Sequence, residues 1–189
     1  MLFFTSDEHY FHRNIIGYEN RPYQHVDEMN QDLVHKFNSV VRPNDETWHL
    51  GDFMMADNPD TAWTYWSRLN GRHHFIEGNH DKWLKRFMKK YGPECLPGIK
   101  LELHPPLIEI KHEGQRIVLC HYALRTWRGV GRGTWMLYGH SHGNLKDVKG
   151  KTMDVGVDPQ GGYPISFNKI KEIMDNQIVE VIDHHEFKS

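Results

Sequence analysis

Short apolar segments that each lead to a group of Asp, Asn or His strongly limit the folds open to this chain. Glycines at 51, 78, 139 and 143 flank three of these polar groups. The segment LFF at 2–4 leads to Asp7, and TWHL at 47–50 leads to Asp52. A short apolar run bounded by turn residues is typical of a buried β-strand, so the pattern predicts five strands with polar side chains at their carboxyl ends. The side chains placed in this way are Asp7, His9, Asp52, Asn79, His80, Asp81, His121, His140 and His142.

Segments with helical periodicity alternate with these strands. Residues 27–41 place apolar side chains on one helix face, and Asp27 is the expected N-cap. Further helices are expected at 59–69, at 82–91 and at 166–174, and Ser166 is the expected N-cap of the last one. Alternating strands and helices indicate an α/β fold.

A β-hairpin is expected at 107–121, with Gly114 in its turn. Additional strands are expected at 152–157 and 177–182. The hairpin argues against an all-parallel sheet, so we predict an α/β fold with mixed β-sheets, two of them packed as layers. A length of 189 residues is expected to form one domain, 1–189.

The composition narrows the class of protein. Hydrophobic content of 38% and charged content of 25% fit a globular chain, and no apolar run approaches the roughly 18 residues of a membrane helix. The amino terminus lacks the basic region of a signal peptide, and two cysteines are too few for a disulfide framework, so a cytoplasmic location is expected. A net charge of −2 gives no basic surface for long nucleic acid, and no membrane partner is expected.

The strand-end side chains form a mixed oxygen and nitrogen ligand set that is too large for one tetrahedral zinc ion. Such a set suits two divalent ions that share a bridging carboxylate, about 3.5–4 Å apart. Mn²⁺ is the first expectation, with Fe, Zn²⁺ and Ni²⁺ as alternatives for these ligands. The Asp7/His9 and His140/His142 pairs are spaced so that, in extended chain, both members point the same way, whereas Glu8 points away. The expected ligands are Asp7, His9, Asp52, Asn79, His121, His140 and His142.

Five polar motifs follow one another along the chain, namely D-x-H at 7–9, G-D at 51–52, G-N-H-D at 78–81, a lone histidine at 121 and G-H-x-H at 139–142. In this order they resemble the motifs of the calcineurin-like metallophosphoesterase superfamily. The chain length and the segment FHRNII at 11–16 are similar to the small bacterial and phage phosphoesterases of that superfamily.

The resemblance implies a four-layer α/β/β/α sandwich, with a dinuclear metal site at the strand-end loops. The first ion would take Asp7, His9 and His142, the second would take Asn79, His121 and His140, and Asp52 would bridge both together with a hydroxide. His80 would donate a proton to the leaving oxygen, and Asp81 would orient His80. Such ions lower the pKa of a bridging water, and a proton donor contributes roughly 10²–10⁴-fold to the rate.

The chain departs from the serine/threonine phosphatases of the superfamily, because GDFMMAD at 51–57 lacks the arginine of their second motif. A protein-phosphatase role is therefore not expected, and the phosphate contacts must come from elsewhere. Trp127 is a candidate pocket wall, with an ordinary core role as the alternative, and Asp154 and Asp158 are candidates to support the site. The candidate substrate-binding residues are His12, Arg13, Asn14, Arg125 and Trp127, with Arg128 and Arg132 as further arginines.

These observations favour a dinuclear-metal-dependent phosphoester hydrolase with a small, nucleotide-like phosphomonoester or phosphodiester as its substrate. Two alternatives remain open at the level of sequence. One is a small nuclease that acts on RNA or DNA ends, and the other is a scaffold that kept the fold without catalysis. The presence of every ligand and of His80 favours an enzyme over a scaffold.

Overall fold

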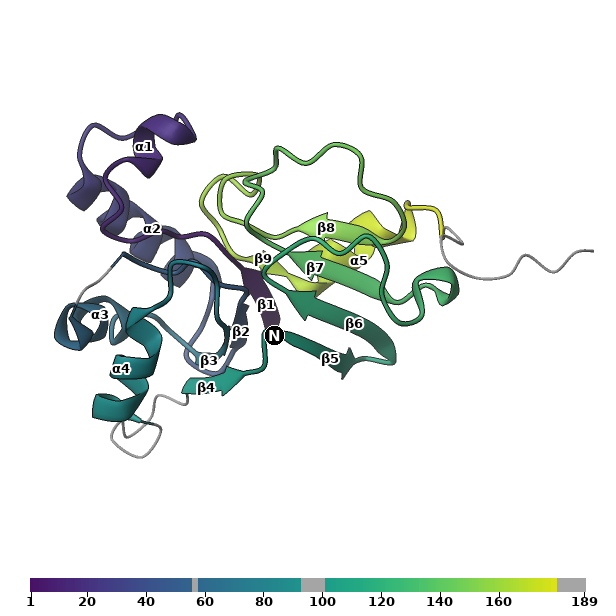
Figure 1. Ribbon diagram of the computed structural model, residues 1–189, viewed down its shortest axis with the longest axis horizontal. Coiled ribbons are helices and arrows are strands. Elements are labelled where there is room, and N and C mark those ends of the chain that lie inside the picture. Colours follow the sequence, from purple (N-terminus) through teal and green to yellow (C-terminus); the bar gives the residue numbers. More distant parts are fainter. Residues whose placement is uncertain (56–57, 93–100, 180–189) are drawn as a thin grey trace, which may run out of the picture.

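The computed structural model describes residues 1–55, 58–92 and 101–179, which form two mixed β-sheets with flanking helices (Figure 1). In this part of the chain, the first sheet has the order β4-β3-β2-β1-β9 and the second β5-β6-β7-β8. The β1–β9 and β5–β6 pairs are antiparallel and the other pairs are parallel. The predicted α/β fold with two mixed sheets and flanking helices is therefore confirmed. The strands are β1 (Leu2–Thr5), β2 (Glu46–His49), β3 (Arg72–Ile76), β4 (Leu101–His104), β5 (Leu107–His112), β6 (Gln115–Cys120), β7 (Trp135–Tyr138), β8 (Thr152–Asp154) and β9 (Ile165–Ser166).

Helices α2, α3 and α4 cover the outer face of the first sheet (Figure 1). Trp66 of α3 lies 5.0 Å from Phe75 of β3, measured between ring centroids, in the core that these helices share with the sheet. None of the described helices has the length and apolarity that crossing a bilayer requires. The helices are α1 (Ile15–Tyr18), α2 (Val26–Val40), α3 (Pro59–Trp66), α4 (Trp83–Tyr91) and α5 (Phe167–Asp175), with a short 3₁₀ helix η1 (Val130–Arg132).

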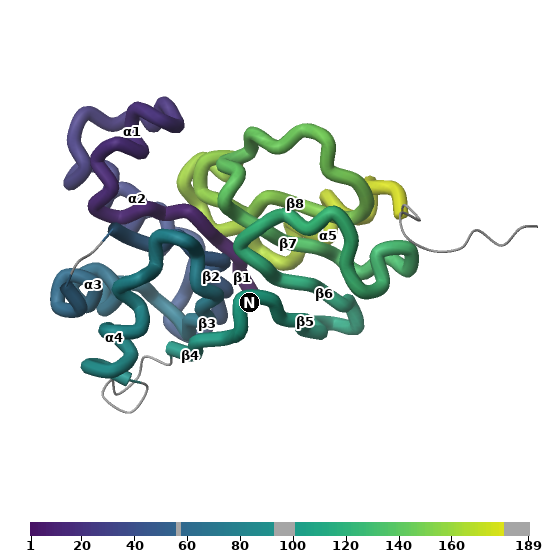
Figure 2. Tube along the Cα trace, viewed as in Figure 1, coloured from purple at the N-terminus to yellow at the C-terminus, as the bar shows by residue number. Residues whose placement is uncertain are grey.

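A second core fills the space between the two sheets. Strand β1 serves both cores, because Phe3 packs on the helix side while Phe4 packs between the sheets, as alternating strand side chains do. Ile170 of α5 joins the core between the sheets. On the other face of the second sheet, Met136 packs against Trp127, in the segment between β6 and β7 that Figure 2 shows looping beside the sheet.

Several element boundaries differ from those expected from the sequence. The first long helix begins at Val26, so Asp27 lies in its first turn rather than at the N-cap, where its charge still favours the helix N-terminus. The helix expected at 59–69 ends at Trp66. The hairpin is present, with Gly114 at φ +86° in its turn. Residues 177–179 are not in a strand, and 180–182 lie outside the described residues.

Candidate metal centre

Backbone hydrogen bonds bring the strand-end loops together at the carboxyl ends of the parallel strands. The Asp7 N–H donates to the Gly51 carbonyl oxygen at 3.0 Å, and the Gly139 N–H donates to that of His121 at 3.0 Å. The two sheets are joined at this edge by the His140 N–H, which donates to Asp7 Oδ2 at 2.8 Å. The sequence placed these side chains after five strands, and the fold gathers the loops at one edge.

The backbone of these loops is left-handed, not extended. Asp7 and His9 have φ angles of +59° and +54°, Asp52 has +56°, and His140 and His142 have +65° and +47°. The expectation that the two i, i+2 pairs converge because the chain is extended is therefore wrong. Residues other than glycine seldom adopt this backbone conformation, and those that do are often found at functional sites. The observed clusters of these side chains are therefore built on left-handed turns.

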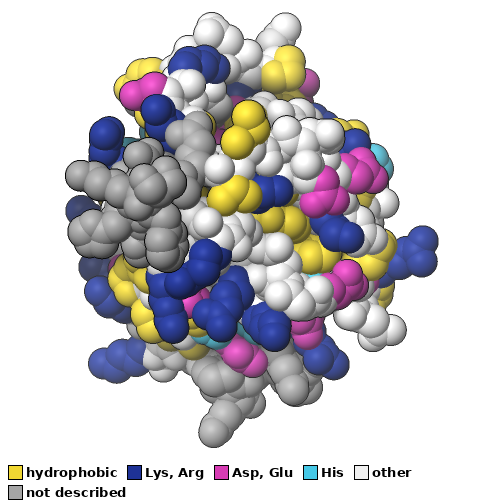
Figure 3. Space-filling model, turned by 90° about the vertical axis from the view of Figure 1, so that its right-hand side faces the viewer, with side chains coloured by type: hydrophobic (Ala, Val, Ile, Leu, Met, Phe, Trp, Pro, Cys, Tyr) yellow, Lys and Arg dark blue, Asp and Glu magenta, His cyan; other side chains and the backbone are white. Residues whose placement is uncertain are grey.

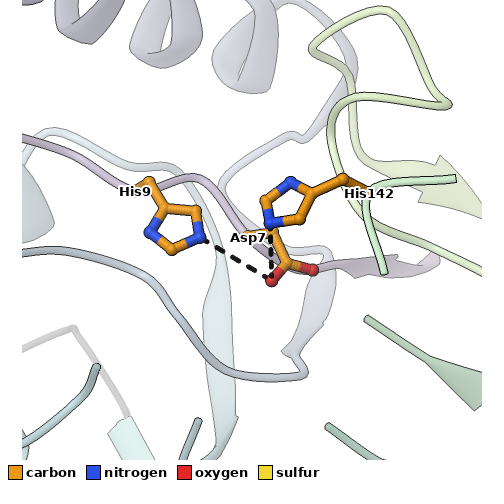
Figure 4. A group of neighbouring side chains, drawn as sticks. All are labelled: Asp7, His9 and His142. Carbon is orange, nitrogen blue, oxygen red and sulfur yellow. Dashed lines mark ion pairs between the residues drawn. The ribbon is translucent and has the colours of Figure 1, made fainter. Parts of the chain in front are cut away.

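Asp7, His9 and His142 form the first cluster of possible metal ligands (Figure 4). Asp7 Oδ1 lies 3.9 Å from His9 Nε2 and 4.0 Å from His142 Nε2. The two imidazole rings are stacked, with centroids 5.3 Å apart. Asp7 and His9 are buried, so three polar atoms converge where little solvent reaches them.

Asp52, His121 and His140 form the second cluster. Asp52 Oδ2 lies 3.5 Å from His121 Nε2 and also 3.7 Å from His9 Nε2 of the first cluster. Asn79 Oδ1 lies 3.1 Å from His121 Nε2, at the exposed side of the cluster. Asp52 therefore stands between the two clusters, and all seven of the expected ligands are in one neighbourhood.

Hydrogen bonds to the outward-facing Nδ1 atoms orient two of the clustered histidines. His121 Nδ1 bonds with the Leu50 carbonyl oxygen at 2.8 Å and His142 Nδ1 with Asp158 Oδ2 at 2.7 Å, so each ring turns its Nε2 inward. Within the described residues, Asp7 Oδ1 and His9 Nε2 are buried without a hydrogen-bond partner. Unpaired buried polar atoms are costly, and a divalent cation would satisfy both. The donor set therefore fits metal ions.

Burial also sets the protonation of the first cluster. It raises the pKa of Asp7 to about 7 and lowers that of His9 to about 2, because the charged form of either group is poorly solvated. Burial alone would raise the pKa of Asp52, but hydrogen bonds from His121 and from the His80 N–H lower it to about 2. The pair Asp52 and His9 is thus an ionised carboxylate and a neutral imidazole, the forms that bind a metal.

Arg21 and Asp158 hold His142 in place from behind. Arg21 donates to both Asp158 oxygens at 2.8 Å and to the carbonyl oxygens of Asp7 and Glu8, also at 2.8 Å. The supporting role considered for Asp158 agrees with this contact, whereas Arg21 escaped notice because it stands alone in sequence, outside every motif. Asp158 thereby fixes the ring orientation of His142.

Glu8 points away from the centre into the core beneath the helices. Its Oε1 lies 2.9 Å from His49 Nδ1, and His49 Nε2 lies 3.1 Å from His73 Nδ1. Burial raises the pKa of Glu8 to about 8 and lowers that of His49 to about 3. This buried network supports the loop that carries Asp7 and His9.

Asp81 does not have the position expected from the resemblance. Its carboxylate accepts hydrogen bonds from the N–H groups of Gly78, Asp52 and Phe53 and from Trp83 Nε1, at 2.7–3.1 Å. Four donors other than the His80 ring thus occupy both oxygens, so the expectation that Asp81 orients His80 is wrong. Asp81 instead ties the loop after β2 to the loop after β3.

His80 lies at the mouth of the centre. Its ring is half-buried, 5.5 Å from the His9 ring and 5.9 Å from the His12 ring between centroids. The backbone N–H of His80 donates to Asp52 Oδ1 at 2.8 Å. Tyr122, which sequence reasoning passed over although it follows His121 directly, packs its ring 4.6 Å from that of His140.

The candidate substrate-binding residues are not all in one place. His12 adjoins the centre, with its Nδ1 3.4 Å from His9 Nδ1. Arg13 and Asn14 are exposed in a shallow hollow beside α1, and Arg125 lines a separate hollow with Leu145 and Asp147. Trp127 is buried and donates from Nε1 to the Thr134 carbonyl oxygen, which matches the core alternative rather than a pocket wall.

Arg128 and Arg132 lie far along the second sheet from the strand-end loops. They line a hollow of about 480 Å³ together with Arg116, near the amino ends of β6 and β7. Figure 3 views the molecule from the side that carries the β5–β6 turn, where Lys and Arg side chains gather beside Asp and Glu. These arginines therefore do not converge on the candidate metal ligands.

Comparison with known proteins places the chain among relatives without an assigned activity. No family model matches it. The uncharacterized protein MJ1445 of Methanocaldococcus jannaschii is 30% identical over 190 residues, which cover 96% of each chain. The chain belongs to the MJ1445 family. In structure, the protein of unknown function AQ665 from Aquifex aeolicus is similar with a TM-score of 0.71 and 26% identity, over 92% of this chain and 98% of that one.

More remote structures overlap only weakly with this member of the MJ1445 family. Yfce, a phosphoesterase from E. coli, has a TM-score of 0.39 and 17% identity, over 80% of this chain and 75% of its own. An overlap at this level carries no conclusion about the activity of the chain.

Proposed function

We propose that the chain is a dinuclear metal-dependent phosphoester hydrolase for a small phosphomonoester or phosphodiester. The observation that carries the proposal is the position of Asp52. Its Oδ2 is 3.7 Å from His9 Nε2 and 3.5 Å from His121 Nε2, so one carboxylate is within reach of both ligand clusters. A shared carboxylate is typical of ions held about 3.5–4 Å apart in phosphoryl-transfer sites.

Each of the two ligand clusters would hold one metal ion. Asp7, His9 and His142 would hold the first, and Asn79, His121 and His140 the second, with Asp52 between them. When bound, the ions would acidify a water molecule between them and neutralise charge on the phosphoryl oxygens. Mn²⁺ is our first choice, with Fe, Zn²⁺ and Ni²⁺ also suited to these ligands.

His80 is the proposed proton donor to the leaving oxygen. Its ring is half-buried at the mouth of the centre and outside both ligand clusters, so it is free to carry a proton. The hydrogen bond from its own N–H to Asp52 fixes its backbone beside the bridging carboxylate. His12 and Tyr122 flank the ligands on the two sides and are the proposed walls of the substrate site.

The small number of carboxylates among the candidate ligands favours an anionic substrate. Asp52 is the one carboxylate among Asp52, His121 and His140, and Asn79 adds an uncharged oxygen. Two divalent ions with only two carboxylates between them would leave the site positively charged, which attracts phosphate. We therefore favour a phosphoester over a neutral ester as substrate.

The test uses the purified full chain, freed of metal with a chelator and reloaded with Mn²⁺. We expect hydrolysis of p-nitrophenyl phosphate or bis-p-nitrophenyl phosphate that depends on added metal and is lost in Asp52→Ala. A panel of labelled oligonucleotides beside mononucleotides distinguishes a nuclease from a small-molecule esterase. Absence of turnover with Mn²⁺, Fe²⁺, Zn²⁺ and Ni²⁺ on all of these esters would overturn the proposal.

A further inference from the structure

A second group of metal-ligating side chains lies on the edge of the first sheet, apart from the strand-end loops. His74 is on β3, and Glu102 and His104 are on the neighbouring strand β4, which ends the sheet (Figure 1). The parallel register pairs His74 with Glu102, and Glu102 and His104 are two residues apart on one strand. Residues two apart on a strand point to the same face, so the three side chains meet.

The spacing of the three polar atoms fits a single ion. His74 Nδ1 is 3.0 Å from His104 Nε2, and Glu102 Oε2 is 3.6 Å from the first and 3.8 Å from the second. A point equidistant from three atoms at these separations lies about 2.0 Å from each, which is the usual Zn–N and Zn–O bond length. One ion can therefore lie within bonding distance of all three atoms.

The surroundings keep the two rings in place and leave one side open. The Trp48 indole stacks on the His74 ring and lies tilted against the His104 ring, with centroids 4.5 Å away in each case. The histidine side chains are 17% and 19% exposed, whereas that of Glu102 is 55% exposed. Three protein ligands and an open side leave a fourth position for water.

The charge state also suits a cation. Burial lowers the pKa of both His74 and His104, which favours the neutral imidazole that binds metal ions. Glu102 supplies one negative charge beside them. Two imidazoles with one carboxylate suit Zn²⁺, Ni²⁺ or Cu²⁺ better than Mg²⁺ or Ca²⁺, which prefer oxygen ligands.

We propose that His74, Glu102 and His104 form a separate binding site for one divalent transition-metal ion of the zinc type. The site shares no residue with the two strand-end clusters and does not depend on the proposed hydrolase activity. An ion there links the edge strand β4 to β3, the strand that leads into Asn79 and His80. It would therefore stabilise the sheet at an edge that has no further strand beside it in the described chain.

The experiment measures Zn²⁺ bound per full-length chain after equilibrium dialysis against the free ion, by elemental analysis. We expect the unaltered chain to hold one Zn²⁺ more than His104→Asn, and Glu102→Gln to bind that ion at least about tenfold more weakly. His112→Asn is the matched control, because His112 is also a half-buried histidine on an edge strand, outside both kinds of cluster. It should bind as much Zn²⁺ as the unaltered chain.

A second measurement separates this site from the strand-end centre. Zn²⁺ should raise the melting temperature of the unaltered chain more than that of His104→Asn, while Mn²⁺-dependent hydrolysis is the same in both. If His104→Asn fails to fold, the measurements on Glu102→Gln test the proposal. The Glu102 side chain is more than half exposed, so its replacement should leave the fold intact. Equal Zn²⁺ content and equal melting shifts in the unaltered chain and in Glu102→Gln and His104→Asn would overturn the proposal. The group would then be a hydrogen-bonded histidine pair without a metal.

Discussion

At the scale of single residues, neighbours in sequence have separate tasks. Asn79 turns its oxygen toward His121, His80 stays at the mouth of the centre, and Asp81 is buried under the loop with four hydrogen-bond donors around its carboxylate. The motif G-N-H-D thus combines a proposed ligand, a proposed proton donor and a structural anchor. Changes at the three positions should affect metal binding, turnover and stability separately.

His80→Ala tests the proton donor. Because the ring belongs to neither ligand cluster, metal content should be unchanged while turnover falls roughly 10²–10⁴-fold. The loss of turnover should be smaller for a p-nitrophenyl ester, because p-nitrophenolate leaves without a proton. It should be larger for an alkyl ester, whose alkoxide must be protonated as it leaves. Elemental analysis and steady-state kinetics on both kinds of ester measure this. Loss of metal without a change in fold would show that His80 is a ligand instead.

Asp158→Asn tests the support behind His142. The amide offers His142 Nδ1 and Arg21 a weaker acceptor than the carboxylate, so affinity for the metal of the first cluster should fall about 10–100-fold. Asp147→Asn is the control, because Asp147 is exposed and away from both clusters. Metal titration of both variants measures the difference. Equal affinities would mean that the contact with Asp158 does not position the ring.

At the scale of elements, the close approach of loops from the two sheets depends on a residue without a side chain. A Cβ at Gly139, directly after β7, would collide with Ser6 Oγ and with Asp7 Oδ2. The same loop carries His140, whose N–H donates to Asp7. A methyl group here would therefore push apart the loops that bring the two sets of ligands together.

Gly139→Ala should reduce metal binding at the first cluster and lower stability by about 1–3 kcal/mol, the usual cost of overpacking. Gly17→Ala is the control, because a Cβ there meets nothing within 4 Å. Metal content and urea unfolding of the two variants measure the effect. A Gly139→Ala chain with full metal content would show that the loops can separate without loss of the site.

At the scale of the whole molecule, buried carboxyl groups make the stability of the metal-free chain depend on pH. The folded pKa values of Asp7 and Glu8, about 7 and about 8, lie above their ordinary values, so the folded chain holds more protons than the unfolded one. Their contribution to stability is present at low pH and is lost as pH rises through these values. His9 and His49 act oppositely, but only below their ordinary pKa of 6.5.

Between pH 6.5 and pH 8, the metal-free chain should therefore lose stability, by up to about 1.4 kcal/mol per pH unit for each carboxyl group. Added Mn²⁺ should flatten the dependence, since a cation favours the ionised form of Asp7. Urea unfolding at several pH values, with chelator and with Mn²⁺, measures both curves. A metal-free stability that rises over this range would contradict the assignment of Asp7 and Glu8 as the dominant groups.

The mixed α/β class, the positions of the strand ends and the set of polar side chains that gather there could all be predicted from the amino-acid sequence. Those features depend on local periodicity and on residue chemistry, which the order of amino acids carries directly. Three features became visible only in the folded chain: Asp7 and His9 converge through left-handed turns, Asp81 anchors loops, and Arg21 supports His142 through Asp158. These contacts join residues far apart in the chain. Their geometry follows from how loops and sheets pack, which no local pattern specifies.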